Sequence, residues 1–103
     1  MYILVWEFQV KPGRVADFER IYATDGLWVQ LFKKHPGYLG TELLQDLDDP
    51  QRYITLDRWA SSQAYNSFHA KWQDEYKELD ERCKGLTDRE SFLGTLSPLQ
   101  SGE

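Results

Sequence analysis

The stretch YILVWEFQV at residues 2–10 decides the fold, because its side chains alternate with the period of a β-strand. One face carries only apolar side chains, those of Tyr2, Leu4, Trp6, Phe8 and Val10. The opposite face carries Ile3 and Val5 beside two polar residues. A sheet with helices on one side and water on the other would not need these apolar residues, so the pattern predicts a strand at least half buried on both faces.

Turn-forming residues divide the next part of the chain into a helix and two strands. The apolar spacing predicts a helix that begins near Arg14, restarts with Asp25 as its N-cap and ends before Pro36. Residues 37–45 and 52–59 then alternate as the two strands of a hairpin.

The last part of the chain predicts one long helix and one short strand. The helix begins at Ser61 or Ser62, and its apolar stripe consists of Tyr65, Phe68, Trp72, Tyr76, Leu79 and Cys83. The strand covers residues 91–96. The predicted order βαββαβ is that of an α+β, ferredoxin-like domain with an antiparallel sheet. We expect a single domain over residues 1–97 and a frayed C-terminal tail over residues 98–103.

Length and charge exclude several classes of protein. The chain has 103 residues and a formal net charge of −5, from 12 Lys and Arg against 17 Asp and Glu. The acidic balance argues against nucleic acid as a partner. No apolar run approaches the roughly 20 residues that cross a bilayer, and no secretory signal is visible, so we expect no membrane association and a cytoplasmic protein.

The second apolar face of the first strand also predicts how the chain assembles. In a ferredoxin-like domain the helices cover one face of the sheet, which leaves Ile3 and Val5 on the other face. A second copy of the same chain is the simplest cover for such residues, so we expect a homodimer.

Four short motifs resemble those of the antibiotic biosynthesis monooxygenase (ABM) family. They are VKPG at residues 10–13, HPGYLGTE at 35–42, DRWAS at 57–61 and FLG at 92–94. The resemblance extends from about residue 2 to residue 95 and depends on turns and strand ends. It implies a dimeric α+β barrel, in which each subunit keeps a pocket between its own sheet and helices.

The resemblance also implies alternatives for function. Some members of the family are cofactor-free oxygenases that act on hydroquinone-like or anthrone-like aromatics, and others cleave haem. The haem-cleaving branch has an Asn in the first strand, and a Trp and a His ten residues apart in the second helical region. This chain has Trp6, Phe68 and Glu78 at the corresponding positions, which disfavours haem binding or degradation.

An aromatic cluster is the candidate binding site for a small aromatic molecule. If Val10 faces the helices, so does Trp6, and the other candidate substrate-binding residues are Tyr22, Trp28, Tyr65, Phe68 and Trp72. Flat aromatic walls suit a planar aromatic ligand. The alternative is that these side chains simply form the core.

His69 and Arg58 are the candidate catalytic residues. The imidazole of His69 would remove a phenolic proton, and the resulting anion would react with oxygen directly. Arg58 would stabilise an enolate or oxyanion. The alternatives are a solvated helix histidine and an arginine paired with Glu42 or Asp57.

These observations predict a cofactor-independent monooxygenase of a small aromatic substrate. The rival is a non-catalytic dimer that binds an aromatic metabolite or acts as a scaffold. The two histidines, His35 and His69, lie on different elements, and the single cysteine, Cys83, lies on the apolar stripe. We therefore expect neither a metal site nor a cofactor.

Overall fold

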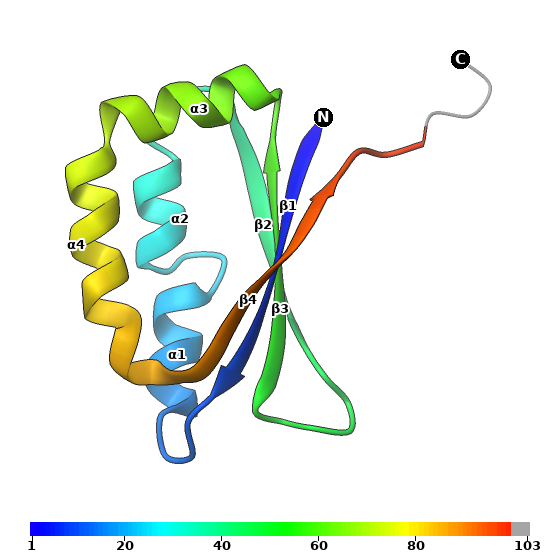
Figure 1. Ribbon diagram of the computed structural model, residues 1–103, viewed down its shortest axis with the longest axis vertical. Coiled ribbons are helices and arrows are strands. Elements are labelled where there is room, and N and C mark those ends of the chain that lie inside the picture. The colour runs from blue at the N-terminus through cyan, green and yellow to red at the C-terminus, as the bar shows by residue number, and fades with distance from the viewer. Residues whose placement is uncertain (100–103) are drawn as a thin grey trace.

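A computed structural model of the chain describes residues 1–99. Its elements run in the order β1 (Tyr2–Val10), α1 (Val15–Tyr22), α2 (Leu27–Phe32), β2 (Tyr38–Gln45), β3 (Arg52–Trp59), α3 (Ser62–Lys71), α4 (Gln73–Cys83), a 3-10 turn (Lys84–Leu86) and β4 (Thr87–Leu96). The four strands form one antiparallel sheet in the order β2-β3-β1-β4. All helices cover the same face of this sheet (Figure 1). The predicted α+β, ferredoxin-like fold is confirmed.

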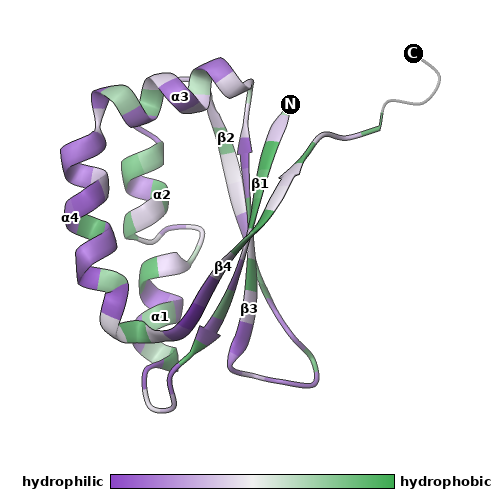
Figure 2. Ribbon diagram, in the orientation of Figure 1, coloured by the Kyte–Doolittle hydropathy of each residue, from purple (hydrophilic) through white to green (hydrophobic). Residues whose placement is uncertain are grey.

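The core lies between the sheet and the helices. Its largest fully buried side chains are Trp59, Tyr53, Phe18, Phe68 and Val10. The alternation in β1 places Phe8 and Val10 in this layer, as the sequence predicted. Figure 2 shows that α4 is mostly hydrophilic with hydrophobic residues at intervals, which is the pattern of a helix with only one buried face. None of the helices within residues 1–99 has the length and apolar character needed to cross a membrane.

Three predicted boundaries were wrong. Gly26 and not Asp25 precedes α2, and a Cβ atom at Gly26 would clash with the carbonyl oxygen of Ile21. The long helix predicted after Ser61 is divided into α3 and α4 at Trp72, whose φ of −116° and ψ of 32° leave the helical region. β4 begins at Thr87, four residues before the predicted start. Of the predicted frayed tail, residues 100–103 lie outside the described part of the chain.

The face of the sheet without helices carries both apolar residues and ion pairs. Ile3 and Val5 lie on it but are only 8% and 9% exposed in the single chain. In the sheet Ile3 lies between Arg58 and Leu96, and Val5 lies between Leu56 and Gly94. The apolar exposure that is left on this face comes from side chains such as Leu44, which is 43% exposed.

Candidate functional site

A small cavity of about 40 Å³ lies between the sheet and the helices. Its lining combines aromatic rings with a few polar groups: Trp6, Phe8, Tyr22, Trp28, Val29, Phe32, Thr41, Thr55, Asp57, Tyr76 and Glu90. A cavity that takes a single benzene ring has a volume of about 150 Å³. An aromatic ligand would therefore have to displace some of these side chains.

The polar side of the cavity is built on β2 and β3. Thr41 and Asp57 are paired across these strands, and the Thr41 hydroxyl donates a 2.8 Å hydrogen bond to Oδ1 of Asp57. Because this bond uses the only hydrogen of the hydroxyl, the Tyr38 hydroxyl must be the donor in its 2.6 Å contact with Thr41. Thr55 lies beside them and is 4% exposed. A directed chain of hydroxyl groups thus ends on the Asp57 carboxylate.

Both carboxyl groups of the cavity have raised pKa values. Burial raises the pKa of Asp57 to about 6, although the hydrogen bond from Thr41 opposes the shift. Burial also raises the pKa of Glu90, and the charge of Asp80 adds to that shift. The lining includes no Lys, Arg or His within the described residues, so no cation offsets these two acids.

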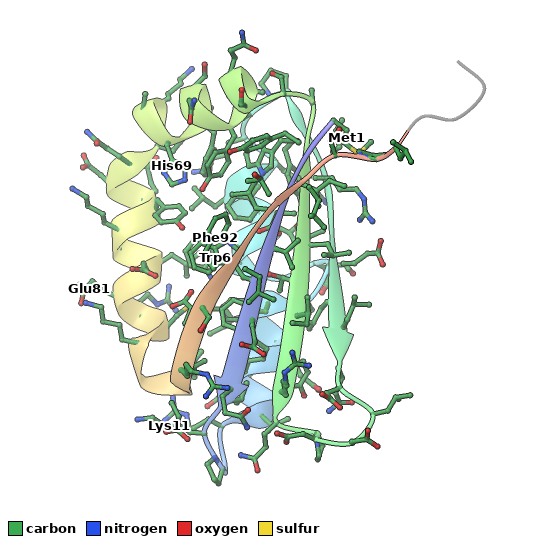
Figure 3. The ribbon with its side chains drawn as sticks, turned by 45° about the vertical axis from the view of Figure 1, so that its right-hand side comes forward. Met1, Trp6, Lys11, His69, Glu81 and Phe92 are labelled. Atoms are coloured by element: carbon green, nitrogen blue, oxygen red, sulfur yellow. The ribbon has the colours of Figure 1, made fainter. Side chains whose placement is uncertain are left out.

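The aromatic side of the cavity contains three of the predicted substrate-binding residues, Trp6, Tyr22 and Trp28. Tyr76 closes it from α4, with its ring 5.0 Å from that of Trp28. The indole N–H of Trp28 is buried and has no hydrogen-bond acceptor within residues 1–99. Trp6 packs against Phe92 of β4 at 4.9 Å between ring centroids, and Figure 3 shows the two side chains together.

The other three predicted substrate-binding residues lie outside the cavity lining. Phe68 is fully buried and packs against Trp59 at 5.1 Å. Trp72 stacks on Phe68, at 5.8 Å between ring centroids. Tyr65 packs between Trp59 and Tyr2. These rings extend the aromatic core from the cavity toward α3.

His69 lies near the junction of α3 and α4 (Figure 3), where it lines a groove formed by residues of these two helices. Its Nε2 is 2.7 Å from the Tyr65 hydroxyl, and its ring centroid is 4.5 Å from that of Tyr76. Burial lowers the pKa of His69. Tyr76 lines both the groove and the cavity, whereas His69 lines only the groove.

Arg58 points to the face of the sheet without helices, because it alternates with Asp57 along β3. Its guanidinium pairs with Glu42 at 2.5 Å, which is the alternative that the sequence left open. The structure therefore does not bring Arg58 to the cavity of its own chain.

The sequence reasoning missed the polar part of the lining. Thr41, Thr55 and Glu90 were not predicted as site residues, and Asp57 entered only through a family motif and as a possible partner of Arg58. A signal was present, since Thr55 and Asp57 alternate in β3 with the buried Tyr53 and Trp59. Polar residues in the buried register of a strand indicate either an internal hydrogen bond or a ligand site.

Across residues 1–99, no group of three or more His, Cys, Asp and Glu side chains is arranged to hold a metal ion. The arrangement instead offers aromatic surface, a carboxylate acceptor and a hydroxyl chain. It can hold a flat ring and accept a hydrogen bond or a proton from it.

Comparisons with known proteins agree with this fold. One similar structure is that of SnoaB, a cofactor-independent oxygenase from Streptomyces nogalater, with 22% identity, a TM-score of 0.79 and coverage of 97% of this chain and 94% of that one. Another is a putative antibiotic biosynthesis monooxygenase from Bordetella bronchiseptica, with 24% identity, a TM-score of 0.72 and coverage of 96% and 97%. A conserved protein from Methanosarcina mazei Go1 shares 19% identity, with a TM-score of 0.69 and coverage of 92% and 89%.

None of the curated proteins matches the chain significantly. The family model for antibiotic biosynthesis monooxygenase matches residues 1–82, which is most of the chain and includes all strands of the sheet except β4. The chain therefore belongs to the antibiotic biosynthesis monooxygenase family.

Proposed function

We propose that the protein is a cofactor-independent monooxygenase of a small aromatic substrate that is hydroquinone-like or anthrone-like. The observation that carries this proposal is the aromatic cavity with its single hydrogen-bonded carboxylate, Asp57, set in the fold of this family. SnoaB, a cofactor-independent oxygenase with a similar fold, supports the reaction class.

The chemistry needs only the substrate and oxygen. Loss of a phenolic proton makes the ring electron-rich, and the ring then supplies the electrons that reduce oxygen. For an anthrone, the ring methylene becomes a carbonyl: one oxygen atom enters that carbon, and the other leaves as water with the two methylene hydrogens. The protein would hold the ring, accept and return the proton, and exclude bulk water.

His69 enters this proposal as a positioning residue, because it does not line the cavity and contacts Tyr76, which does. It would hold Tyr65 by a hydrogen bond and Tyr76 by packing. Arg58 would pair with Glu42 on the face of the sheet opposite the cavity. We therefore assign Arg58 no contact with the substrate of its own chain.

Oxygen uptake with an anthrone and with a hydroquinone, corrected for autoxidation without protein, tests the function. We expect His69→Ala to raise KM several-fold and to change kcat little, with Gln73→Ala in the same groove as the control. A kcat lower by about a hundredfold or more would instead give His69 the general-base role that the sequence suggested. Ligand binding without oxygen uptake in the unmodified protein would favour the rival, a non-catalytic binding protein.

We further propose that two copies assemble through the sheet face that lacks helices, as a dimeric α+β barrel, and that the dimer works in the cytoplasm. The exposed Leu44 on that face supports the dimer. Cell fractionation with an antibody against the protein tests the location.

A further inference from the structure

The cavity has an unusual balance of charge for a site between a sheet and helices. Asp57 and Glu90 both line it, and the other lining side chains are aromatic, aliphatic or hydroxyl-bearing. Burial raises the pKa of both carboxyl groups, as expected for acids without a cationic partner.

Asp57 has acceptor capacity that the protein leaves unused. A carboxylate offers two oxygens, and within residues 1–99 Thr41 is the one side chain that donates to it, at Oδ1. The hydroxyl chain from Tyr38 through Thr41 fixes the orientation of the carboxyl group. Because Asp57 lines the cavity and its other oxygen accepts no hydrogen bond from the described residues, that oxygen is available to a donor that enters.

Trp28 adds a second unused polar group to the same lining. It is 8% exposed, and its Nε1–H is buried without an acceptor in the described part of the chain. The Tyr22 hydroxyl and the Cys83 thiol lie close to this indole, but neither accepts a well-aligned hydrogen bond from it. An acceptor oxygen at the edge of a ligand could take their place, beside a hydroxyl that donates to Asp57.

We propose that Asp57 accepts the hydrogen bond of a ring hydroxyl, and that Asp57 and Glu90 together make the cavity select uncharged hydroxyaromatic ligands over carboxylated ones. A carboxylate on the ligand would meet Asp57, which burial makes costly to ionise, and Glu90, which lines the cavity from the solvent-exposed side of β4. No cationic side chain among the described lining residues would offset the repulsion. The inference deepens the proposed function, since it takes the cavity as the substrate site. It adds the charge class of the substrate and the residue that touches it.

Isothermal titration calorimetry at pH 7.5 without oxygen tests this proposal with a matched pair of probes, 2-naphthol and 6-hydroxy-2-naphthoate. We expect the unmodified protein to bind 2-naphthol at least about tenfold more tightly than the acid. In Asp57→Asn, the two affinities should move in opposite directions: 2-naphthol loses about fivefold, because a charged acceptor is replaced by a neutral one, and the acid gains about tenfold. A folding defect would lower both affinities.

Glu90→Gln should improve binding of the acid more than binding of 2-naphthol, because only the acid carries a charge that Glu90 repels. Asp48→Asn, in the exposed loop between β2 and β3, is the control and should change neither affinity. Equal affinities for both probes in the unmodified protein, or parallel changes in Asp57→Asn, would overturn the charge selection while oxygen uptake could still support the oxygenase. Selective binding of 2-naphthol without oxygen uptake would support the charge selection and overturn the oxygenase. No binding of either probe would overturn both.

Discussion

Among single residues, Asp57 shows most clearly how a group proposed for function can destabilise the fold. It lies in the buried register of β3 between Thr55 and Trp59, and its one hydrogen-bond donor among the described residues is a neutral hydroxyl. Burial raises its pKa from 3.8 to about 6. The folded protein thus binds this proton more tightly than the unfolded chain does. Ionisation of Asp57 therefore destabilises the fold, and a residue kept at such a cost is a candidate for a functional role.

Asp57→Asn should make the protein more stable at pH 7.5, by roughly 1–3 kcal/mol. The penalty in the unmodified protein is absent below the unfolded pKa of about 4, grows between pH 4 and pH 6, and is complete above the folded pKa of about 6. The difference in the free energy of unfolding between Asp57→Asn and the unmodified protein should therefore grow between pH 4 and pH 6 and stay constant above that. Urea unfolding at several pH values measures it, with Asp48→Asn as the control. A difference that does not depend on pH would contradict this origin.

The open question of whether each aromatic residue belongs to the core or to the binding site can also be decided residue by residue. Phe68 is 0% exposed and does not line the cavity, whereas Trp6 is partly exposed and does. Phe68→Leu should lower the free energy of unfolding by about 1–2 kcal/mol and leave 2-naphthol affinity unchanged. Trp6→Leu should cost less stability and weaken 2-naphthol binding about tenfold. Urea unfolding measures the stability of both variants, and calorimetry measures their affinity for 2-naphthol. Equal changes in both quantities in the two variants would contradict the assignment of Phe68 to the core and of Trp6 to the binding site.

At the scale of elements, the sequence predicted the strands and their order because each pattern is local. The alternation over residues 2–10 and the two strands joined by a turn-rich loop are visible within a few residues. The division between α3 and α4 is different. The N–H of Trp72 still bonds to the carbonyl of Phe68, and that of Tyr76 bonds to the carbonyl of Trp72. The three- and four-residue spacing therefore continues through the break, and periodicity cannot reveal it.

Strand β4 forms an edge of the sheet and places Phe92 beside the cavity wall. Phe92 is 47% exposed and packs on Trp6, which lines the cavity. Because the cavity of about 40 Å³ is too small for an aromatic ring, entry requires such a contact to open. Phe92→Ala should speed 2-naphthol association several-fold in stopped-flow tryptophan fluorescence.

Leu93→Ala is the matched control for that prediction, since Leu93 is the next residue along β4 and is 54% exposed. We expect its association rate to equal that of the unmodified protein. Equal rates in Phe92→Ala would mean that ligands enter elsewhere, for example past Tyr76 on the α4 side.

At the scale of the whole molecule, the candidate site shows what the sequence could not supply. Trp6 and Trp28 were found because large aromatic residues at regular spacing point to the interior. The polar lining was missed because it depends on which strands are neighbours. Thr41 meets Asp57 only through the pairing of β2 with β3, and Glu90 reaches the cavity only because β4 pairs with β1. His69 was placed by helix spacing alone, which does not reveal that Tyr76 lines the cavity and His69 does not.

The proposed dimer is the prediction that involves the whole molecule, because it uses the sheet face opposite the cavity. On that face Leu44 is 43% exposed on the edge strand β2, and such a residue gains most from a second copy. Sedimentation velocity should give the unmodified protein twice its 12.2 kDa chain mass. Leu44→Lys should weaken association at least about tenfold, since a buried unpaired charge is costly. Leu47→Lys, at a loop position that is 100% exposed, should change nothing. Because the cavity lies on the other face of the sheet, the monomeric Leu44→Lys variant should still bind 2-naphthol. An unmodified protein that is monomeric at micromolar concentration would contradict the dimer.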